Sequence, residues 1–254
     1  MSEGQPATAP PPRTWRQRYP WLVPGGLLLL LTLLTVNVLA DGPLIPVDDR
    51  IHELVHQIST SPHLRWVKDG PATPARILVD LGNIRIAFPI LLVAAGYAAL
   101  SRRSPRPLVS ALAGMVLVLA TVVPLKILIG RPNPGSVRLP PHHLLGAFPS
   151  GHTTTACVCY VLAVLLVAPD AHSRGRRIAL GAAAVLGVLV AAAMVWCHLH
   201  WFTDVVAGFA LAGLIVPLSL RLTGRHANPP RPGGPPPDES RALAASVDQR
   251  GPDT

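Results

Sequence analysis

Charged residues are scarce in this sequence, and lysine is almost absent. Only 14% of the 254 residues are charged, whereas half are hydrophobic. Such a chain is too apolar for a soluble domain and too long for a simple membrane anchor. The composition therefore indicates a protein that spans a membrane several times. Its two lysines are Lys68 and Lys126, so a lysine at the end of an apolar segment is an unusual choice for this chain.

Cysteine is also scarce. The chain has three cysteines, and two of them, Cys157 and Cys159, lie inside an apolar run. They are too few for a disulfide framework, and they show no spacing typical of a thiolate metal site. We interpret them as small hydrophobic residues and predict neither a bound metal nor another cofactor.

The arginines give the chain a formal net charge of +9. Nucleic-acid binding would require them to form one basic face. Instead they fall in short clusters between apolar runs, at residues 13–18, 102–106, 174–177 and 221–225. We therefore expect no nucleic-acid partner. If the apolar runs cross a membrane in alternation, all four clusters lie on the same side, which the positive-inside bias predicts to be the cytoplasm.

The apolar runs predict an all-α integral membrane bundle of six transmembrane helices. A span needs about 20 residues to cross the hydrocarbon core of a bilayer. The expected spans are residues 21–40, 77–101, 108–129, 152–167, 178–197 and 202–220. Residues 38–40 also resemble a signal-peptide cleavage site, but the later spans favour an uncleaved first helix. Both termini of this cell-membrane protein would then be cytoplasmic.

The remaining segments are assigned by composition. Residues 1–19 are expected to form a disordered cytoplasmic N-terminus, residues 20–226 the membrane domain, and residues 227–254 a disordered cytoplasmic tail. Three segments should lie on the outer face, namely 41–76, 130–151 and 197–203.

Within the first outer segment, a short amphipathic helix is predicted from the spacing of its apolar residues. These are Ile51, Leu54, Val55 and Ile58, and they follow Asp48 and Asp49, which can cap a helix. We interpret His52 and His56, one turn apart, as part of a solvated face.

The outer loops also contain residues suited to binding an anion. Lys126 lies near the outer end of the third span, and an intramembrane charge costs about 2.5–3.5 kcal/mol at a helix centre, less near the ends. It therefore indicates an anionic partner, unless its ammonium extends to lipid phosphate. Ser150, Gly151 and the start of the fourth span offer backbone N–H groups and the positive end of a helix dipole. Phosphate is the expected anion.

A histidine–aspartate pair lies in the other loop. His200 and Asp204 are four residues apart and share one helical face. The carboxylate can hold one ring nitrogen and leave the other free to attack. This pair alone is also compatible with an ordinary interfacial histidine. With His152 facing the same phosphate, however, one histidine can attack phosphorus while the other protonates the leaving oxygen.

These residues resemble the type 2 phosphatidic acid phosphatases, the PAP2 superfamily, over about residues 108–220. The second motif of that family, Pro-Ser-Gly-His, is present at 149–152, and the His-x-x-x-Asp half of its third motif at 200–204. The resemblance implies His200 as the nucleophile that forms a phosphohistidine, Asp204 as its orienting partner and His152 as the general acid. It also implies phosphate binding by Lys126, Ser150 and Gly151, without a metal.

Two arginines of the family pattern are missing. The first motif, Lys followed by six residues and Arg-Pro, places its arginine at Asn133, and the third motif places Ser-Arg at Ala193 and Met194. Neither Asn nor Met can replace the bidentate bonds of arginine. The phosphate-binding set therefore also includes Arg131, with Asn133, Arg138 and His198 as auxiliary candidates.

The leading hypothesis is a membrane phosphatase with its active site on the extracytoplasmic side. Its substrate would be a lipid phosphomonoester or diphosphate of the phosphatidate, phosphatidylglycerol phosphate or polyprenyl phosphate type. The alternative is a degenerate relative that binds such a lipid without turnover, as Asn133 and Met194 suggest. A third hypothesis is a histidine metal site drawn from His142, His143, His152, His198 and His200, although their spacing matches no known ligand pattern.

Overall fold

A computed structural model describes residues 21–67, 72–135, 146–168 and 173–224 of the chain. Within these ranges there is no strand, which confirms the predicted all-α class. The helices are α2 (Leu22–Leu39), α3 (Ile45–Ser59), the 3₁₀ helix η1 (Arg65–Val67), α4 (Pro74–Gly82), α5 (Ile84–Ser101), α6 (Arg106–Ile129), α7 (Gly151–Val167), α8 (Arg174–Trp196) and α9 (Phe202–Leu222). The chain divides into two units, 1–223 and 224–254. All that follows concerns the first unit.

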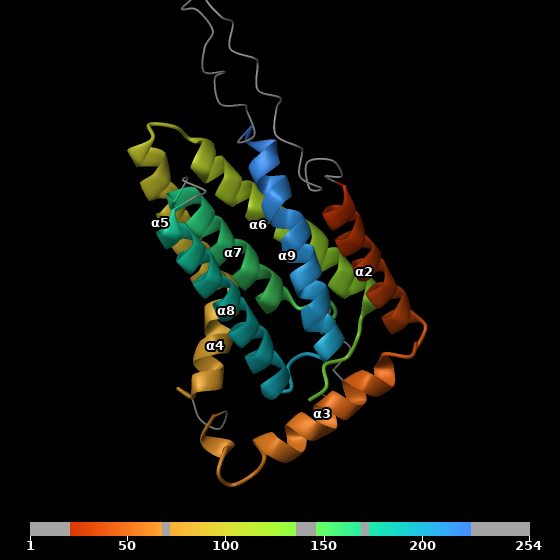
Figure 1. The fold of residues 1–254 in the computed structure, drawn as a ribbon. Helices are drawn as coiled ribbons and strands as arrows, with labels where there is room; N and C mark the ends of the chain where they lie inside the picture. Colours follow the sequence, from red (N-terminus) through yellow and green to blue (C-terminus); the bar gives the residue numbers. More distant parts are fainter. Residues whose placement is uncertain (1–20, 68–71, 136–145, 169–172, 225–254) are drawn as a thin grey trace, which may run out of the picture. The chain divides into compact units, whose positions relative to one another are not determined.

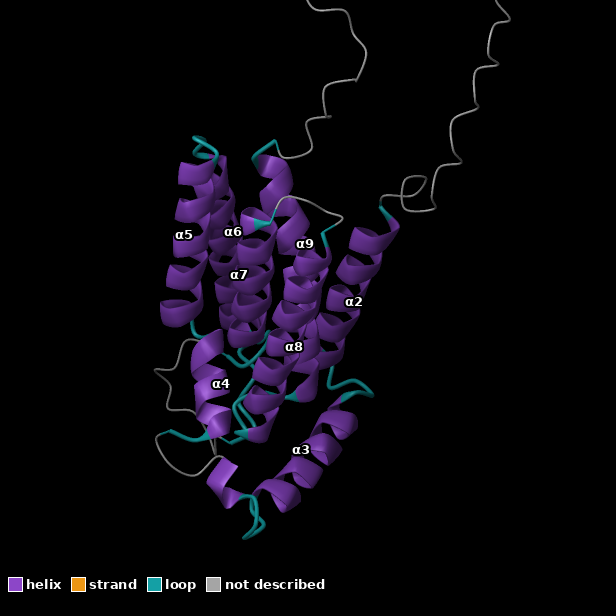
Figure 2. Ribbon diagram, turned by 60° about the vertical axis from the view of Figure 1, so that its left-hand side comes forward, coloured by secondary structure: helices purple, strands orange, loops and turns teal. Residues whose placement is uncertain are grey.

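Helix α7 is the centre of the bundle. It packs against α5, α6, α8 and α9, while α2 packs on α9 and α4 packs on α8. Figures 1 and 2 show the long helices running side by side around it. Val158, Cys159 and Leu162 of α7 are fully buried in the main apolar core. Cys159 is thus a small core residue, and the three cysteines are free thiols.

The predicted membrane bundle is confirmed by the length and composition of its helices. Five helices, α2, α5, α6, α8 and α9, are long and apolar enough to cross a membrane, and α7 is a shorter apolar helix of 17 residues. At 1.5 Å per residue, α7 is about 25 Å long, close to the hydrocarbon thickness of a bilayer. Leu28, Leu29 and Leu33 of α2 remain more than half exposed. An apolar outer surface of this kind suits lipid.

The second span begins later than predicted, because the apolar segment is broken at Asn83. There the backbone is extended, and the Asn83 side chain accepts a hydrogen bond from the Arg85 N–H, which caps the start of α5. The preceding residues form the separate helix α4. Gly82 at its end packs against α7, where an added Cβ would lie 3.1 Å from the Cβ of His152. Tyr160 of α7 also donates to the Leu81 carbonyl (2.8 Å).

Helix α3 crosses the end of the bundle at which α8 ends and α9 begins (Figure 1). The predicted outer helix exists, but it starts at Ile45, so Asp48 lies inside its first turn and does not cap it. His56 is exposed, as predicted for a solvated face, whereas His52 is half-buried. Asp48 and Ser59 are buried, whereas Leu54 and Ile58 are 51% and 48% exposed. The side of α3 that carries Asp48, His52 and Ser59 thus faces the protein, where it finds polar partners.

The arginine-rich ends of the helices lie at the opposite end of the bundle. Figures 1 and 2 place the end of α5, the start of α6, the start of α8 and the end of α9 together there. Arg102, just after α5, donates to the carbonyl of Leu166 near the end of α7 (2.5 Å). Three of the four predicted clusters therefore lie at one end, and residues 13–18 lie outside the described residues.

Candidate active site

A cavity of about 260 Å³ lies at the α3 end of the bundle. It is lined by Lys126, Asn133, Gly146, Gly151, His152, Met194, Leu199 and His200. These residues come from the end of α6, the loop after it, the start of α7, the end of α8 and the turn before α9. The structure therefore brings together Lys126, Gly151, His152 and His200, which the sequence had placed in separate segments.

The start of α7 forms one wall of the cavity. Ser150 is the N-cap residue, and its hydroxyl oxygen accepts hydrogen bonds from the Thr153 N–H (3.4 Å) and the Thr153 hydroxyl (3.0 Å). This cap buries Ser150 completely, and it is not among the lining residues. Gly151 and His152 line the cavity at the positive end of the helix dipole, where an anion is stabilised. Phosphate binding by the Ser150 side chain stays a prediction.

Lys126 is held at the cavity by the loop that precedes α7. Its ammonium Nζ donates to the carbonyl oxygens of Gly146 (2.6 Å) and Ala147 (3.1 Å). The helix that carries Lys126 ends at Gly130, whose φ of 59° is in the left-handed region that glycine adopts readily. The bonds to the loop hold the ammonium at the cavity that Lys126 lines.

The turn between α8 and α9 positions His200. His198 has a φ of 56°, the Leu199 N–H donates to the Met194 carbonyl (3.0 Å), and the His198 N–H donates to that of Val195 (3.0 Å). This is the hydrogen-bond pattern of a Schellman helix end, with histidine in the position that glycine usually occupies. It reverses the chain within a few residues and places His200 directly before α9.

His200 and Asp204 form a buried pair. The Nδ1 of His200 lies 3.2 Å from Oδ2 of Asp204, which also accepts the Trp201 N–H (3.0 Å). The carboxylate is thereby fixed at the start of α9, where it engages Nδ1 of the ring. Burial lowers the pKa of His200 below its usual value of 6.5, while the hydrogen bond and charge of Asp204 oppose this shift. A neutral ring is the form that can attack phosphorus.

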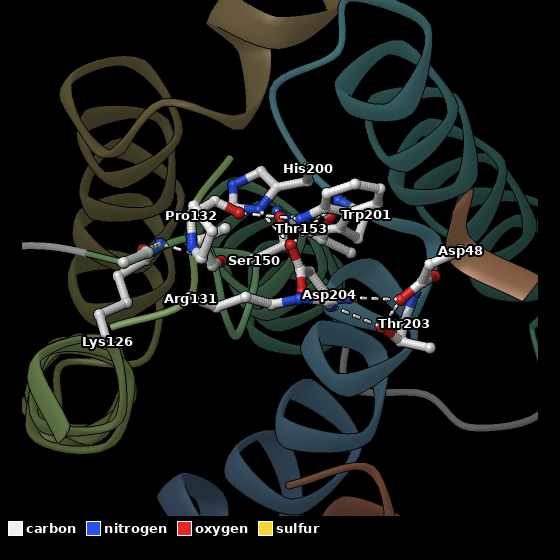
Figure 3. Close-up of polar contacts among 12 residues, drawn as sticks. Asp48, Lys126, Arg131, Pro132, Ser150, Thr153, His200, Trp201, Thr203 and Asp204 are labelled. Carbon is white, nitrogen blue, oxygen red and sulfur yellow. Dashed lines mark hydrogen bonds and ion pairs between the residues drawn. The ribbon is translucent and has the colours of Figure 1, made fainter. Parts of the chain in front are cut away.

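Arg131 lies behind Asp204, away from the cavity lining (Figure 3). Its Nη1 donates to Asp204 Oδ1 (2.6 Å) and to the Thr203 hydroxyl (2.8 Å), and its Nη2 donates to Asp48 Oδ2 (2.7 Å). Its guanidinium carbon lies 5.1 Å from the centre of the Trp201 ring. The sequence predicted a phosphate contact for this residue. The structure instead uses its guanidinium to join two buried carboxylates.

The two positions at which the family pattern has arginine do line the cavity. Asn133 is half-buried there, and Met194 is 2% exposed. Counting along the motifs thus located both positions at the site. Among the described lining residues, Lys126 is the one lysine or arginine. The described part of the cavity lining thus contains two histidines and one lysine.

Of the other auxiliary candidates, His198 is not among the residues that line the cavity. The ring of His198 faces α3, with Nε2 3.2 Å from the Ser59 hydroxyl and Nδ1 3.2 Å from Nδ1 of His52. Its ring centre lies 5.5 Å from that of His56. Arg138, His142 and His143 lie outside the described residues. In the described part of the chain, no group of three or more His, Cys, Asp or Glu side chains is arranged to hold a metal ion.

Sequence reasoning missed the residues that hold the site from behind, above all Asp48 and Thr203. A signal for Asp48 was present in the spacing of α3. Asp48, His52, Val55 and Ser59 recur at helical spacing, and this face is the more buried one. The apolar residues of α3 recur at a similar spacing and predict that a different side of the helix faces inward.

Comparisons with known proteins agree with the motif-based resemblance. The sequence profile of the PAP2 superfamily matches residues 107–227. The fold is similar to the crystal structure of the first transmembrane PAP2 type phosphatidylglycerolphosphate phosphatase from Bacillus subtilis, with a TM-score of 0.68 and 22% identity. This match covers 81% of the present chain and 98% of the other. No curated protein sequence matches the chain. The family resemblance is thereby confirmed, and the structural match shows a shared fold.

Proposed function

We propose, from the membership of residues 107–227 in the PAP2 superfamily, that the protein is a membrane phosphatase acting on a lipid phosphomonoester or diphosphate. One observation carries the proposal. His152, Lys126 and the Asp204-backed His200 meet at a single cavity next to the start of α7. This combination supplies a nucleophile, a proton donor and an anion site, which are the groups that phosphoryl transfer to histidine requires.

The proposed reaction has two steps. The Nε2 of His200 attacks phosphorus, the bond from phosphorus to the leaving oxygen breaks, and His152 gives that oxygen a proton. Water then attacks the phosphohistidine, gives a proton to His152 and releases phosphate with a free His200. Lys126 and the N-terminus of α7 stabilise the phosphoryl oxygens, and Asp204 stabilises the cationic ring of His200. No metal takes part in this proposal.

The orientation in the membrane is also a proposal. The cavity lies at the end of the bundle opposite the arginine-rich helix ends. Since arginine is enriched on the cytoplasmic side, the active site would face the extracytoplasmic side and both termini the cytoplasm. The exposed apolar residues Leu54 and Ile58 of α3 would lie at the lipid surface from which the substrate enters.

Phosphate release from defined lipids tests the function. The purified full chain in detergent is assayed with phosphatidylglycerol phosphate, phosphatidate and a polyprenyl diphosphate, first with and then without a strong chelator. We expect His200→Ala to abolish release and to prevent labelling of the protein by ³²P-lipid. The control is His63→Ala, which changes an exposed histidine of the outer segment. Unchanged release in the His200 variant would contradict the mechanism, and a loss caused by the chelator would contradict its independence of metal.

A second candidate function is lipid binding without turnover. It is favoured by Asn133 and Met194, since both line the cavity at positions where the family pattern has phosphate-binding arginines. In that case the wild-type protein binds a lipid phosphate but releases no phosphate from any lipid of the panel. Release from one of these lipids rules this candidate out.

A further inference from the structure

Asp48 is a buried carboxylate on α3, the helix that crosses the active-site end of the bundle. It is 1% exposed. Its Oδ1 accepts the Thr203 N–H (2.9 Å), and its Oδ2 accepts the Thr203 hydroxyl (2.5 Å) and Nη2 of Arg131 (2.7 Å). Burying an ionised carboxylate is unfavourable unless it is paired and hydrogen-bonded in this way. Asp48 thereby links α3 to the start of α9 and to the loop after α6.

Two carboxylates share the guanidinium of Arg131. One of its terminal nitrogens binds Asp204 and the other binds Asp48. The three side chains together therefore carry one excess negative charge. Without the charge of Asp48, Arg131 would neutralise Asp204 alone. The ring of His200 would then face a carboxylate whose charge is already cancelled.

We propose that Asp48 is a positioning residue for the reaction: by sharing Arg131, it preserves the negative charge with which Asp204 orients His200 and stabilises its phosphorylated, cationic ring. This inference rests on the proposed function, because it concerns His200 as the nucleophile. It gives α3 a part in catalysis although none of its residues lines the cavity. It also assigns Arg131 to the support of Asp204.

The other ionisable groups near His200 determine the direction of the expected effect. Asp204 of α9 favours the protonated ring, whereas Lys126 of α6 disfavours it. His152 of α7 lies close enough to His200 for the two rings to interact electrostatically. Asp80 of α4 faces His152. Removing the charge of Asp48 leaves the guanidinium of Arg131 paired with Asp204 alone. Protonation of His200 becomes less favourable, so its titration moves to lower pH, and the cationic intermediate becomes less stable.

The test compares Asp48→Asn with Asp49→Asn. The first variant keeps the shape of the side chain and an oxygen for the Thr203 N–H, but removes the charge. Asp49, the next residue of the same helix, is exposed and serves as the matched control. For Asp48→Asn we expect kcat per folded molecule to fall about 10- to 100-fold, the range found for residues that support metal-binding histidines, and the acid limb of the pH profile to move to lower pH. Asp49→Asn should match the wild type.

A double variant tests whether the effect passes through Arg131. In an Arg131→Gln background, Asp48→Asn should leave the position of the acid limb unchanged. An additional shift in that background would show that Asp48 acts on His200 by another route and would overturn the proposal.

An NMR titration of the His200 ring separates this inference from the proposed function. If the wild-type protein releases no phosphate from any lipid, the phosphatase proposal fails, but a lower His200 titration midpoint in Asp48→Asn still supports the role of Asp48. If the wild type is active and the midpoint does not move, the positioning role is wrong and the phosphatase proposal stands.

The test also covers the case in which the Asp48→Asn variant folds poorly. If Asp48→Asn only reduces the yield, and the folded fraction keeps the wild-type kcat and acid limb, Asp48 is a structural residue and the proposal is overturned. If no folded Asp48→Asn is obtained, Asp48→Glu takes its place, because it keeps the charge and adds one methylene group. Its acid limb should stay at the wild-type pH, and a shift to lower pH would contradict the proposal.

Discussion

His200 Nδ1 lies 3.2 Å from Asp204 Oδ2, and both side chains are buried at the start of α9. The pair is local in sequence, but the carboxylate is held from three directions. Trp201 donates its N–H to Oδ2, and Arg131 donates to Oδ1. Asp204 also accepts, through its backbone carbonyl, the N–H of Ser150 at the cap of α7 (3.0 Å). The proposed nucleophile is therefore coupled to the anion site by one residue.

Replacing Asp204 by Asn should nearly abolish phosphate release. The amide can turn its NH₂ group toward Nδ1 of His200, which selects the wrong ring tautomer, and it removes the ion pair with Arg131. In a histidine-based site of similar design, the equivalent change lowers kcat by about 10⁴-fold. We expect a loss of the order of 10³- to 10⁴-fold, measured as lipid phosphate hydrolysis per folded molecule. The exposed Glu53→Gln is the control, and an Asp204 variant with activity within tenfold of the wild type would contradict the assigned role.

The pH profile should report the shifted titration of His200. Burial lowers its pKa below the usual 6.5. The attacking ring of His200 must be neutral, so a lowered pKa means that activity is lost only at a lower pH. We expect kcat/KM to be maintained below pH 6.5 and its acid limb to follow at more acidic values, measured from roughly pH 4 to 8. An acid limb above pH 6.5 would show that the nucleophile is another group or that its environment is more polar.

The close packing of α4 on α7 gives a steric prediction. A Cβ added at Gly82 would lie 2.6 Å from Cγ1 of Val190 on α8, 3.1 Å from the Cβ of His152 and 3.2 Å from the His152 carbonyl oxygen, so Gly82→Ala crowds Val190 most and also presses on the proposed general acid. Since misplacement by about 1 Å can cost 100-fold in rate, a smaller shift should lower kcat by about tenfold. Gly96→Ala in α5 is the matched control, because nothing lies within 4 Å of its added Cβ. Equal activities of the two variants would show that α4 does not position His152.

Local patterns explain what the sequence predicted well. The short spacing of His200 and Asp204 predicted that they pair, although His200 lies just before α9 and not within it. The apolar runs predicted the long helices because each is determined by its own composition. The family motifs even located Asn133 and Met194 at the cavity, although both depart from the pattern.

Long-range pairing explains what the sequence did not predict. Arg131 and Asp48 are 83 residues apart, and no local pattern indicates that they meet. The Arg131 side chain was expected at the phosphate, but in the structure it pairs with two buried carboxylates. His198 and His52 are 146 residues apart in the sequence, so no local pattern predicts their contact either. The break at Asn83 was hidden because the apolar pattern continues across it.

Restoring an arginine at Asn133 should strengthen phosphate binding. Asn133 is half-buried on the loop after α6 and lines the cavity, so a longer side chain at this position can reach a bound phosphoryl group. A hydrogen bond to a charged group contributes about 1.5–3 kcal/mol, and about 1.4 kcal/mol corresponds to a tenfold change in affinity. We expect Asn133→Arg to lower the inhibition constant of inorganic phosphate by about tenfold or more. Asn133→Gln, which lengthens the side chain without adding charge, separates the effect of charge from that of size. If both variants bind phosphate as weakly as the wild type, the bound phosphoryl group does not lie beside residue 133, and the position inferred for it between Lys126 and the start of α7 is wrong.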